Sequence, residues 1–268
     1  MAFDVKDIDE SKAPLLDHLI ELRTRLFRSI VALLVAFGGC LYFADSILGF
    51  LVQPLRDAFP EGEGQLIFTK LPEVFFVELK VALFAGFMVS FPIIANQLWA
   101  FVAPGLYANE KKAFLPFLIA TPVLFLSGAA LAYYVVMPTA FLFFLGFGGE
   151  VGGLDVKALP ATGDYLNLVM QFILAFGLTF LLPVLLMLLN RAGIVSRAQL
   201  AGARRYVIVG VVALAAVVTP PDPGSQVILA VPLLVLFEGS LFLMRFQEKK
   251  LNKPDEETEA EEPTAADA

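Results

Sequence analysis

The sequence predicts an all-α membrane protein with six transmembrane helices and with both termini on the cytoplasmic side. Hydrophobic residues make up 58% of the 268 residues, a share well above that of soluble globular domains. These residues gather in six apolar stretches that polar segments separate. Because backbone groups inside a bilayer must be satisfied within their own segment, we expect each stretch to form a helix.

The six predicted spans differ in length. Their coarse bounds are Leu26–Phe50, Val74–Val102, Ala113–Phe147, Tyr165–Leu189, Tyr206–Val218 and Val227–Phe246. A helix needs about 20 residues to cross a hydrocarbon core about 30 Å thick, and the first four stretches reach that length. The fifth stretch has only 13 residues, and the sixth is interrupted by Pro232 and Glu238. Spans five and six are therefore expected to be short.

Prolines inside the apolar stretches predict kinked helices. Each proline removes one backbone donor, and its ring clashes with the preceding turn of a helix. Six prolines stand in such positions: Pro92, Pro116, Pro122, Pro138, Pro183 and Pro232. We expect several kinked spans, which together form a curved wall.

The two ends of the chain differ from the membrane portion, which is assigned to residues 14–252. Residues 1–13 are expected to form a cytoplasmic segment. Leucines at helical spacing predict an amphipathic helix over Pro14–Arg28, which would lie on the membrane and run into the first span. Residues 253–268 hold seven acids and one lysine, a composition typical of a disordered, solvated tail.

Lysine and arginine are distributed unequally between the two sides of the predicted bundle. Fifteen of them lie in the terminal segments and in the connections on the same side. The opposite side carries four, namely Arg56, Lys70, Lys80 and Lys157. By the positive-inside rule, both termini lie in the cytoplasm, and an even number of spans agrees with this.

The residues give no support to a catalytic or metal-binding function, so we expect neither enzymatic activity nor a cofactor. His18 is the only histidine and Cys40 the only cysteine. The glycine-rich segment 146–153 lacks the spacing of a phosphate-binding loop, which favours a flexible outer loop. Glu238 is a carboxylate within a span, so it is either a functional acid or a paired one, with Arg245 as the candidate partner.

Two further acids have an ordinary interpretation and a functional one. Glu21 can pair with Arg25 one helical turn later, and Glu110 can be a solvated acid beside Lys111 and Lys112. Taken alone, these residues favour the ordinary interpretation for both acids. Their neighbours in the sequence change that assessment.

Three motifs, in this order, resemble the TatC family: HLIELRTRL (residues 18–26), QLWAFVAPGLYANEKK (residues 97–112) and RRYVIVG with VTPPDPGSQ (residues 204–226). The similarity extends from about Leu15 to Phe246. TatC is the multispanning receptor of the twin-arginine translocase, which moves folded proteins across the bacterial plasma (inner) membrane with the proton-motive force. The resemblance implies this function, and with it the binding of signal peptides that carry consecutive arginines.

The resemblance implies a signal-peptide site at the cytoplasmic face. The matching positions are Glu21 and Glu110, with Arg23 and Arg25 as supporting residues. The chemistry agrees, because a guanidinium presents a planar fork of donors that a carboxylate can meet with two hydrogen bonds, whereas lysine cannot. We therefore expect Glu21 and Glu110 to receive the arginines.

The resemblance also implies partner subunits. Thr219 and Gln226 match a polar site used by the single-span subunits TatA and TatB. Positions that the family tends to need are matched by Pro54, Phe101, Tyr133 and Asp222. Assembly into homo- and hetero-oligomers and contact with membrane lipids are expected, and no nucleic-acid partner is.

One departure from the family and one rival interpretation remain. Many TatC proteins carry a glutamate in span four, within FGxxFExPV, where this chain has Leu181 in FGLTFLLPV. A mechanism that needs that acid cannot apply unchanged. The rival is a secondary transporter or channel, which also uses broken spans and an intramembrane acid, but the internal repeat and the midplane polar cluster usual in transporters are not visible in the sequence.

Overall fold

The computed structural model describes residues 6–59, 64–106, 115–191, 193–219 and 223–251. Its elements are α1 (Lys6–Tyr42), α2 (Ala44–Ala58), α3 (Glu73–Leu106), α4 (Leu115–Leu131), the π-helical segment η2 (Ala132–Val136), α5 (Met137–Leu145), β1 (Gly149–Val151), β2 (Leu154–Val156), α6 (Thr162–Thr179), α7 (Leu182–Arg191), α8 (Arg197–Gly202), α9 (Arg204–Val218) and α10 (Pro223–Leu251).

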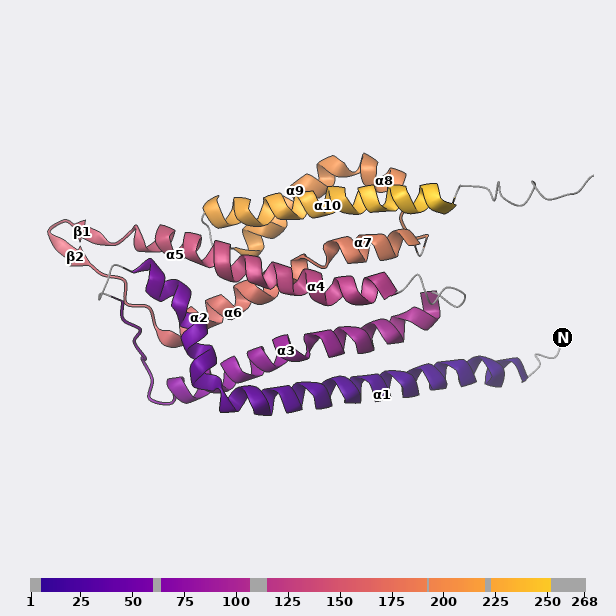
Figure 1. Ribbon diagram of the computed structural model, residues 1–268, viewed down its shortest axis with the longest axis horizontal. Helices are drawn as coiled ribbons and strands as arrows, with labels where there is room; N and C mark the ends of the chain where they lie inside the picture. Colours follow the sequence, from indigo (N-terminus) through magenta and orange to yellow (C-terminus); the bar gives the residue numbers. More distant parts are fainter. Residues whose placement is uncertain (1–5, 60–63, 107–114, 192, 220–222, 252–268) are drawn as a thin grey trace, which may run out of the picture.

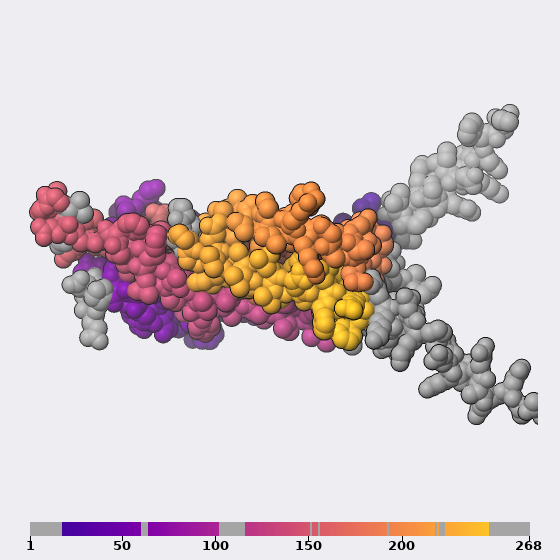
Figure 2. All heavy atoms as spheres, turned by 90° about the horizontal axis from the view of Figure 1, so that it is seen from above, coloured from indigo at the N-terminus to yellow at the C-terminus, as the bar shows by residue number. Residues whose placement is uncertain are grey.

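The helices form an elongated bundle (Figure 1). α1 begins and α10 ends at one end of the bundle, here called the terminal end, whereas α2 and the β1–β2 hairpin lie at the other, here called the hairpin end. From above, α8, α9 and α10 cover much of one long face in orange and yellow (Figure 2). In the described residues, five segments are long and apolar enough to cross a membrane: His18–Tyr42, Glu73–Phe101, Pro116–Leu145, Thr162–Arg191 and Pro223–Phe246.

The first span differs from the sequence-based prediction at both ends. α1 is one unbroken helix of 37 residues, so the segment from residue 14 to residue 28 continues straight into the span and does not form a separate helix on the membrane (Figure 1). The span ends at Tyr42, and α2 follows at an angle from Ala44. The predicted stretch runs past this turn to Phe50 because Ile47 and Leu48 of α2 are also apolar and pack against the core.

Helix breaks occur near two of the predicted prolines. The third span changes from α4 to the π-helical segment η2 and then to α5, whose second residue is Pro138. The fourth span is broken between α6 and α7, with Pro183 in the first turn of α7. A proline gives no backbone donor, so the preceding turn is the place where a helix breaks or bulges. The π-helical segment in span three and the break in span four agree with the helix irregularities predicted at Pro138 and Pro183.

The last two spans differ from each other. α9 has 15 residues, or about 22 Å of helix, which falls short of a hydrocarbon core about 30 Å thick. Its predicted shortness is confirmed. α10 has 29 residues and continues through Pro232. The prediction of a short sixth span is wrong, because the helix begins directly at Pro223 and does not stop at the internal proline.

Glycines allow close contact at two helix crossings. A Cβ atom on Gly86 of α3 would lie 2.8 Å from the backbone N and Cα of Phe37 in α1. In the second crossing, between α4 and α6, a Cβ on Gly128 would lie 2.6 Å from the carbonyl oxygen of Phe176, and one on Gly177 would lie 2.7 Å from the Phe125 ring. Small residues at such points let membrane helices pack closely.

The connections at the hairpin end are bonded to one another. The Ile67 N–H donates to the Pro160 carbonyl (3.2 Å), and the Thr162 N–H donates to the Ile67 carbonyl (2.8 Å). Glu73 adds a carboxylate that accepts from the backbone N–H groups of Thr69 (2.8 Å) and Gly163 (2.9 Å). These bonds fix the start of α3 against the start of α6.

The glycine-rich segment is an ordered antiparallel hairpin rather than the flexible loop that the sequence favours. β1 pairs with β2 with Gly149 opposite Val156 and Val151 opposite Leu154. Gly152 and Gly153 make the turn with φ values of 62° and 85°. Two-residue hairpin turns with positive φ require residues of this kind.

Candidate functional site

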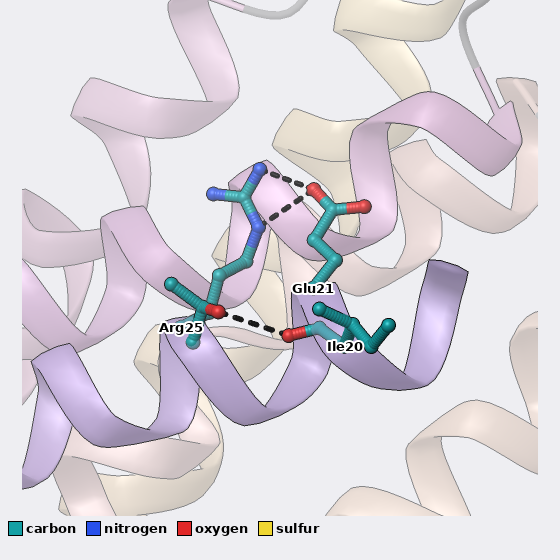
Figure 3. A network of polar contacts seen from close by, with 4 residues as sticks. Ile20, Glu21 and Arg25 are labelled. Carbon is teal, nitrogen blue, oxygen red and sulfur yellow. Dashed lines mark hydrogen bonds and ion pairs between the residues drawn. The ribbon is translucent and has the colours of Figure 1, made fainter. Parts of the chain in front are cut away.

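Glu21 and Arg25 form an ion pair near the terminal end of the bundle (Figure 3). The Nε and Nη2 atoms of Arg25 donate to the same oxygen of Glu21, Oε1, at 2.8 and 2.5 Å. Within the described part of the chain, Oε2 of Glu21 takes no hydrogen bond. The two side chains are 33% and 22% exposed. Arg25 thus orients the carboxylate through Oε1 and leaves Oε2 unused by its own hydrogen bonds.

Arg23 lies apart from this pair. It is exposed and stands two residues after Glu21, a spacing that places two side chains on different faces of a helix. Thr24 is bonded along its own helix, with its hydroxyl donating to the Ile20 carbonyl at 2.9 Å. The structure therefore brings Arg25 to Glu21 but does not bring Arg23 there.

Phe101 of α3 contacts α1 one helical turn before Glu21. Its ring stacks on the His18 imidazole with centroids 4.3 Å apart and planes 20° apart. His18 precedes Glu21 by one helical turn, so the stack holds the last turns of α3 beside the Glu21–Arg25 pair. Glu110, the second predicted acid, lies outside the described residues, nine positions after Phe101 in the sequence. The His18 contact was missed because nothing in a single sequence indicates which ring faces a lone histidine.

Trp99 links α3 to α4. Its indole N–H donates to the Thr121 hydroxyl at 2.7 Å, and that hydroxyl donates to the Phe117 carbonyl at 2.8 Å. Trp99 is buried. This chain of bonds fixes the two helix ends that the segment containing Glu110 connects.

Thr219 and Gln226 lie at the junction of α9 and α10. Thr219 is buried, and its hydroxyl donates to the Ala215 carbonyl of its own helix at 2.8 Å. The Gln226 side chain is half-buried and reaches the Val212 carbonyl across the junction at 3.5 Å. Asp222, predicted with them, lies outside the described residues. The structure thus places Thr219 and Gln226 at one junction. The hydrogen bond of Thr219 is short, whereas the contact of Gln226 is long.

Pro54 and Tyr133 meet at the hairpin end. Pro54 stands inside α2 and has no N–H, so the Phe50 carbonyl one turn earlier has no donor in the helix. The Tyr133 hydroxyl donates to that carbonyl at 2.6 Å, and its ring stacks on the Phe50 ring with centroids 4.3 Å apart. Beside it, the Tyr165 hydroxyl donates to the Leu51 carbonyl at 2.8 Å. Tyr133 therefore supplies the hydrogen bond that Pro54 removes.

Replacing Tyr133 by phenylalanine is expected to destabilise the protein by about 1–3 kcal/mol, because the Phe50 carbonyl would lose its donor while the ring stack stays. The midpoint of thermal unfolding in detergent measures the effect. Tyr134 is the matched control, since its side chain is exposed. Tyr134→Phe should change the free energy of unfolding by no more than about 0.5 kcal/mol. Equal midpoints for both variants would refute the proposed pairing of Pro54 with Tyr133.

Glu238 pairs with Arg204, not with Arg245 as the sequence suggested. The Nη2 atom of Arg204 lies 2.9 Å from Oε2 of Glu238, and the two side chains are 54% and 52% exposed. Arg204 begins α9, so the pair joins α9 to α10. An acid within an apolar stretch is thereby matched by a cation from the neighbouring helix.

Leu181 lies at the break between α6 and α7 and lines a cavity of about 560 Å³. Other lining residues include Trp99, Thr121, Thr179 and Leu214. The Thr179 hydroxyl donates to the Ala175 carbonyl of its own helix. Leu181, the residue at which the sequence departs from the pattern noted above, therefore faces a mainly apolar cavity.

Comparison with known proteins gives consistent matches. A sequence model of the family described as Sec-independent protein translocase protein (TatC) matches residues 17–232. The chain is 46% identical over 258 residues to the TatC protein of Magnetococcus marinus, which covers 96% of this chain and 93% of that protein. It is 39% identical over 237 residues to the TatC protein of Escherichia coli, with 88% and 90% covered.

Solved structures give the same result. A crystal structure described as twin arginine translocase receptor TatC in DDM superimposes with a TM-score of 0.71 at 39% sequence identity, covering 84% of this chain and 98% of that chain. This similarity confirms the predicted all-α, six-span membrane fold. The chain therefore belongs to the TatC family of Sec-independent protein translocase proteins and is a multi-pass membrane component of the twin-arginine translocase.

Proposed function

We propose that this chain is the core receptor subunit of the twin-arginine translocase. It would bind the Arg-Arg signal peptides of folded proteins at the terminal end of the bundle and organise partner subunits for export driven by the proton-motive force. The observation that carries the proposal is the Glu21 carboxylate, which Arg25 orients through one oxygen only. The description of a solved relative as a twin arginine translocase receptor supports it.

The free oxygen of Glu21 suits an arginine of the signal peptide. An ionised carboxylate has about four lone-pair positions, and Arg25 uses those of Oε1. An incoming guanidinium can donate to Oε2 without displacing Arg25. We assign the second arginine to Glu110, because the end of α3 that leads to it is held beside α1 by the His18–Phe101 stack. Arg23 remains a supporting residue in this proposal.

The proposed docking site for the single-span subunits TatA and TatB is the junction of α9 and α10. α9 has 15 residues, which makes the wall thin at this place. Among the described residues, the Gln226 amide is held by one long contact of 3.5 Å, so a partner helix can compete for it. Thr219, which is buried, shapes the junction from inside. Asp222 belongs to the same proposed site, and homo- and hetero-oligomers in the lipid bilayer are expected.

We place the protein in the bacterial plasma membrane with the terminal end in the cytoplasm. The excess of lysine and arginine in the segments at that end supports this orientation. Residues 1–13 would be a cytoplasmic segment, residues 14–252 the six-span domain and residues 253–268 an acidic cytoplasmic tail. The proposal needs no cofactor, metal ion or nucleic acid, and it assigns no catalytic residue.

The secondary transporter is the weaker alternative. Transporters place substrate or ions at broken helices, where polar groups converge near the midplane. The break between α6 and α7 carries Leu181, and the cavity there is lined mainly by apolar side chains. An apolar lining at this break indicates a structural kink between α6 and α7 rather than a binding site for an ion.

The experiment that tests the receptor proposal is photo-cross-linking in membrane vesicles that contain the partner subunits. Two signal peptides carry the same photoreactive residue and differ only in Arg-Arg or Lys-Lys. We expect the Lys-Lys peptide to bind at least about tenfold more weakly, the equivalent of one lost charge-assisted hydrogen bond. Equal cross-linking of both peptides, or none to α1, would overturn the proposal. Uptake of a small solute by the purified chain in liposomes would favour the transporter.

A further inference from the structure

A groove between α1, α3 and α6 has one polar end and one apolar end. Its volume is about 840 Å³, within the range of about 300–1,000 Å³ usual for ligand sites. The polar residues in its lining are Lys80, Asn167 and Gln171, and the apolar ones include Phe84, Phe87 and Leu178. The groove therefore differs from an ordinary lipid-facing surface by containing a cation and two amides.

The polar residues lie toward the hairpin end, where α3 begins at Glu73 and α6 at Thr162. With a rise of about 1.5 Å per residue, Lys80 lies about 10 Å from the start of α3, whereas Phe87 lies about 21 Å from it. Along α6, Asn167 and Gln171 lie about 8 and 14 Å from the start, and Leu178 lies about 24 Å from it. The lining thus changes from polar to apolar along the direction of the helices.

This change falls near the edge of the bilayer. The apolar segment Glu73–Phe101 has 29 residues, or about 43 Å of helix, so about 7 Å projects on each side of a core about 30 Å thick. A residue about 10 Å from the start of α3 then lies just inside the hydrocarbon boundary, within reach of the phosphate and glycerol groups of lipids. A lysine at this depth extends its ammonium group toward that layer.

Lys80 has no acidic partner among the described residues. Glu78, the nearest acid in its own helix, stands two residues earlier, and residues at that spacing do not face each other on a helix. A cation at membrane depth is costly unless an anion is near it. The groove therefore has a charge that an external anion can neutralise.

We propose that this groove binds one phospholipid of the surrounding bilayer, with its phosphate at Lys80 and an acyl chain along Phe84, Phe87 and Leu178. The amides of Asn167 and Gln171 donate to phosphate or ester oxygens of the same lipid. Because the site holds a cation and no acid, it prefers an anionic headgroup such as phosphatidylglycerol over a zwitterionic one. The bound lipid fills the space between α1 and α6 and so completes the wall.

Native mass spectrometry of the full chain in detergent tests the proposal, with phosphatidylglycerol and phosphatidylcholine of identical acyl chains as the added lipids. We expect one saturable phosphatidylglycerol site, which Lys80→Gln weakens about fivefold, the effect usual for one lysine near an anionic headgroup. Binding of phosphatidylcholine should not change. Lys70→Gln is the matched control, since Lys70 is exposed and does not line the groove, and it should bind both lipids as the parent does.

Three results would overturn the proposal. Equal phosphatidylglycerol affinity in the parent and in Lys80→Gln would show that the lysine is not the headgroup site. An equal loss in Lys70→Gln would show attraction by overall charge only. Displacement of the lipid by a synthetic apolar helix, to the same extent in the parent and in Lys80→Gln, would assign the groove to a partner helix.

Discussion

Glu21→Lys is expected to weaken the binding of Arg-Arg signal peptides by about tenfold to a hundredfold. The parent offers a carboxylate oxygen that Arg25 leaves free, and a charge-assisted hydrogen bond to such an oxygen is worth about 1.5–3 kcal/mol. The lysine removes that acceptor and adds a positive charge beside Arg25 and the incoming arginines. Glu21→Gln should lie between the two, because it keeps an acceptor oxygen and loses only the charge. Binding of a fluorescent Arg-Arg peptide to the purified chain measures the loss.

The loss should come from recognition and not from unfolding. The Glu21–Arg25 pair is partly exposed and spans one helical turn, and such pairs contribute only about 0.3–0.5 kcal/mol. The midpoint of thermal unfolding should therefore change little. Asp45→Lys is the matched control: the same charge change in the first turn of α2, at the hairpin end. A Glu21→Lys protein that still binds like the parent, or an equal loss in Asp45→Lys, would contradict the role of Glu21.

Hydropathy predicted where the chain meets lipid but not where it turns. The apolar run through residue 50 hides the end of α1 at Tyr42, because Ile47 and Leu48 of α2 are apolar and pack against the core. Hydropathy shows that a residue prefers an apolar environment, but it does not distinguish the protein core from the lipid, because both are apolar. Pro232 was also misleading. A proline within a span predicts an interruption of the helix, whereas α10 continues through Pro232.

The site residues show the same limit at the level of single contacts. The resemblance selected Pro54 and Tyr133, but only the fold shows that the Tyr133 hydroxyl serves the carbonyl that Pro54 leaves without a donor. Glu238 was recognised as an acid that needs a partner, yet the partner, Arg204, stands 34 positions earlier in the sequence. Local spacing favoured Arg245, because a single sequence contains no information on which helices are neighbours.

Gly86→Val is expected to destabilise the bundle by about 1–3 kcal/mol or more, the usual cost of inserting atoms into a packed contact. A Cβ on Gly86 would lie 2.8 Å from the N and Cα atoms of Phe37. These are backbone atoms, so no side chain can rotate away, and α1 must move as a unit. Thermal unfolding in detergent measures the lost stability. Helix propensity alone predicts the opposite sign, since valine is the better helix former.

The same substitution should also weaken signal-peptide binding, although Gly86 is far from Glu21 in the fold. α1 is a single straight helix (Figure 1), so a shift at Phe37 is carried to His18 and separates its ring from Phe101. Gly39→Val is the control on α1, since a Cβ there has nothing within 4 Å, and it should preserve both stability and peptide binding. If Gly86→Val lowers the unfolding midpoint but leaves peptide affinity at the parent value, the α1–α3 crossing supports the fold without positioning Glu21. A loss of both in Gly86→Val, with neither lost in Gly39→Val, ties recognition at Glu21 to the packing of α1 on α3.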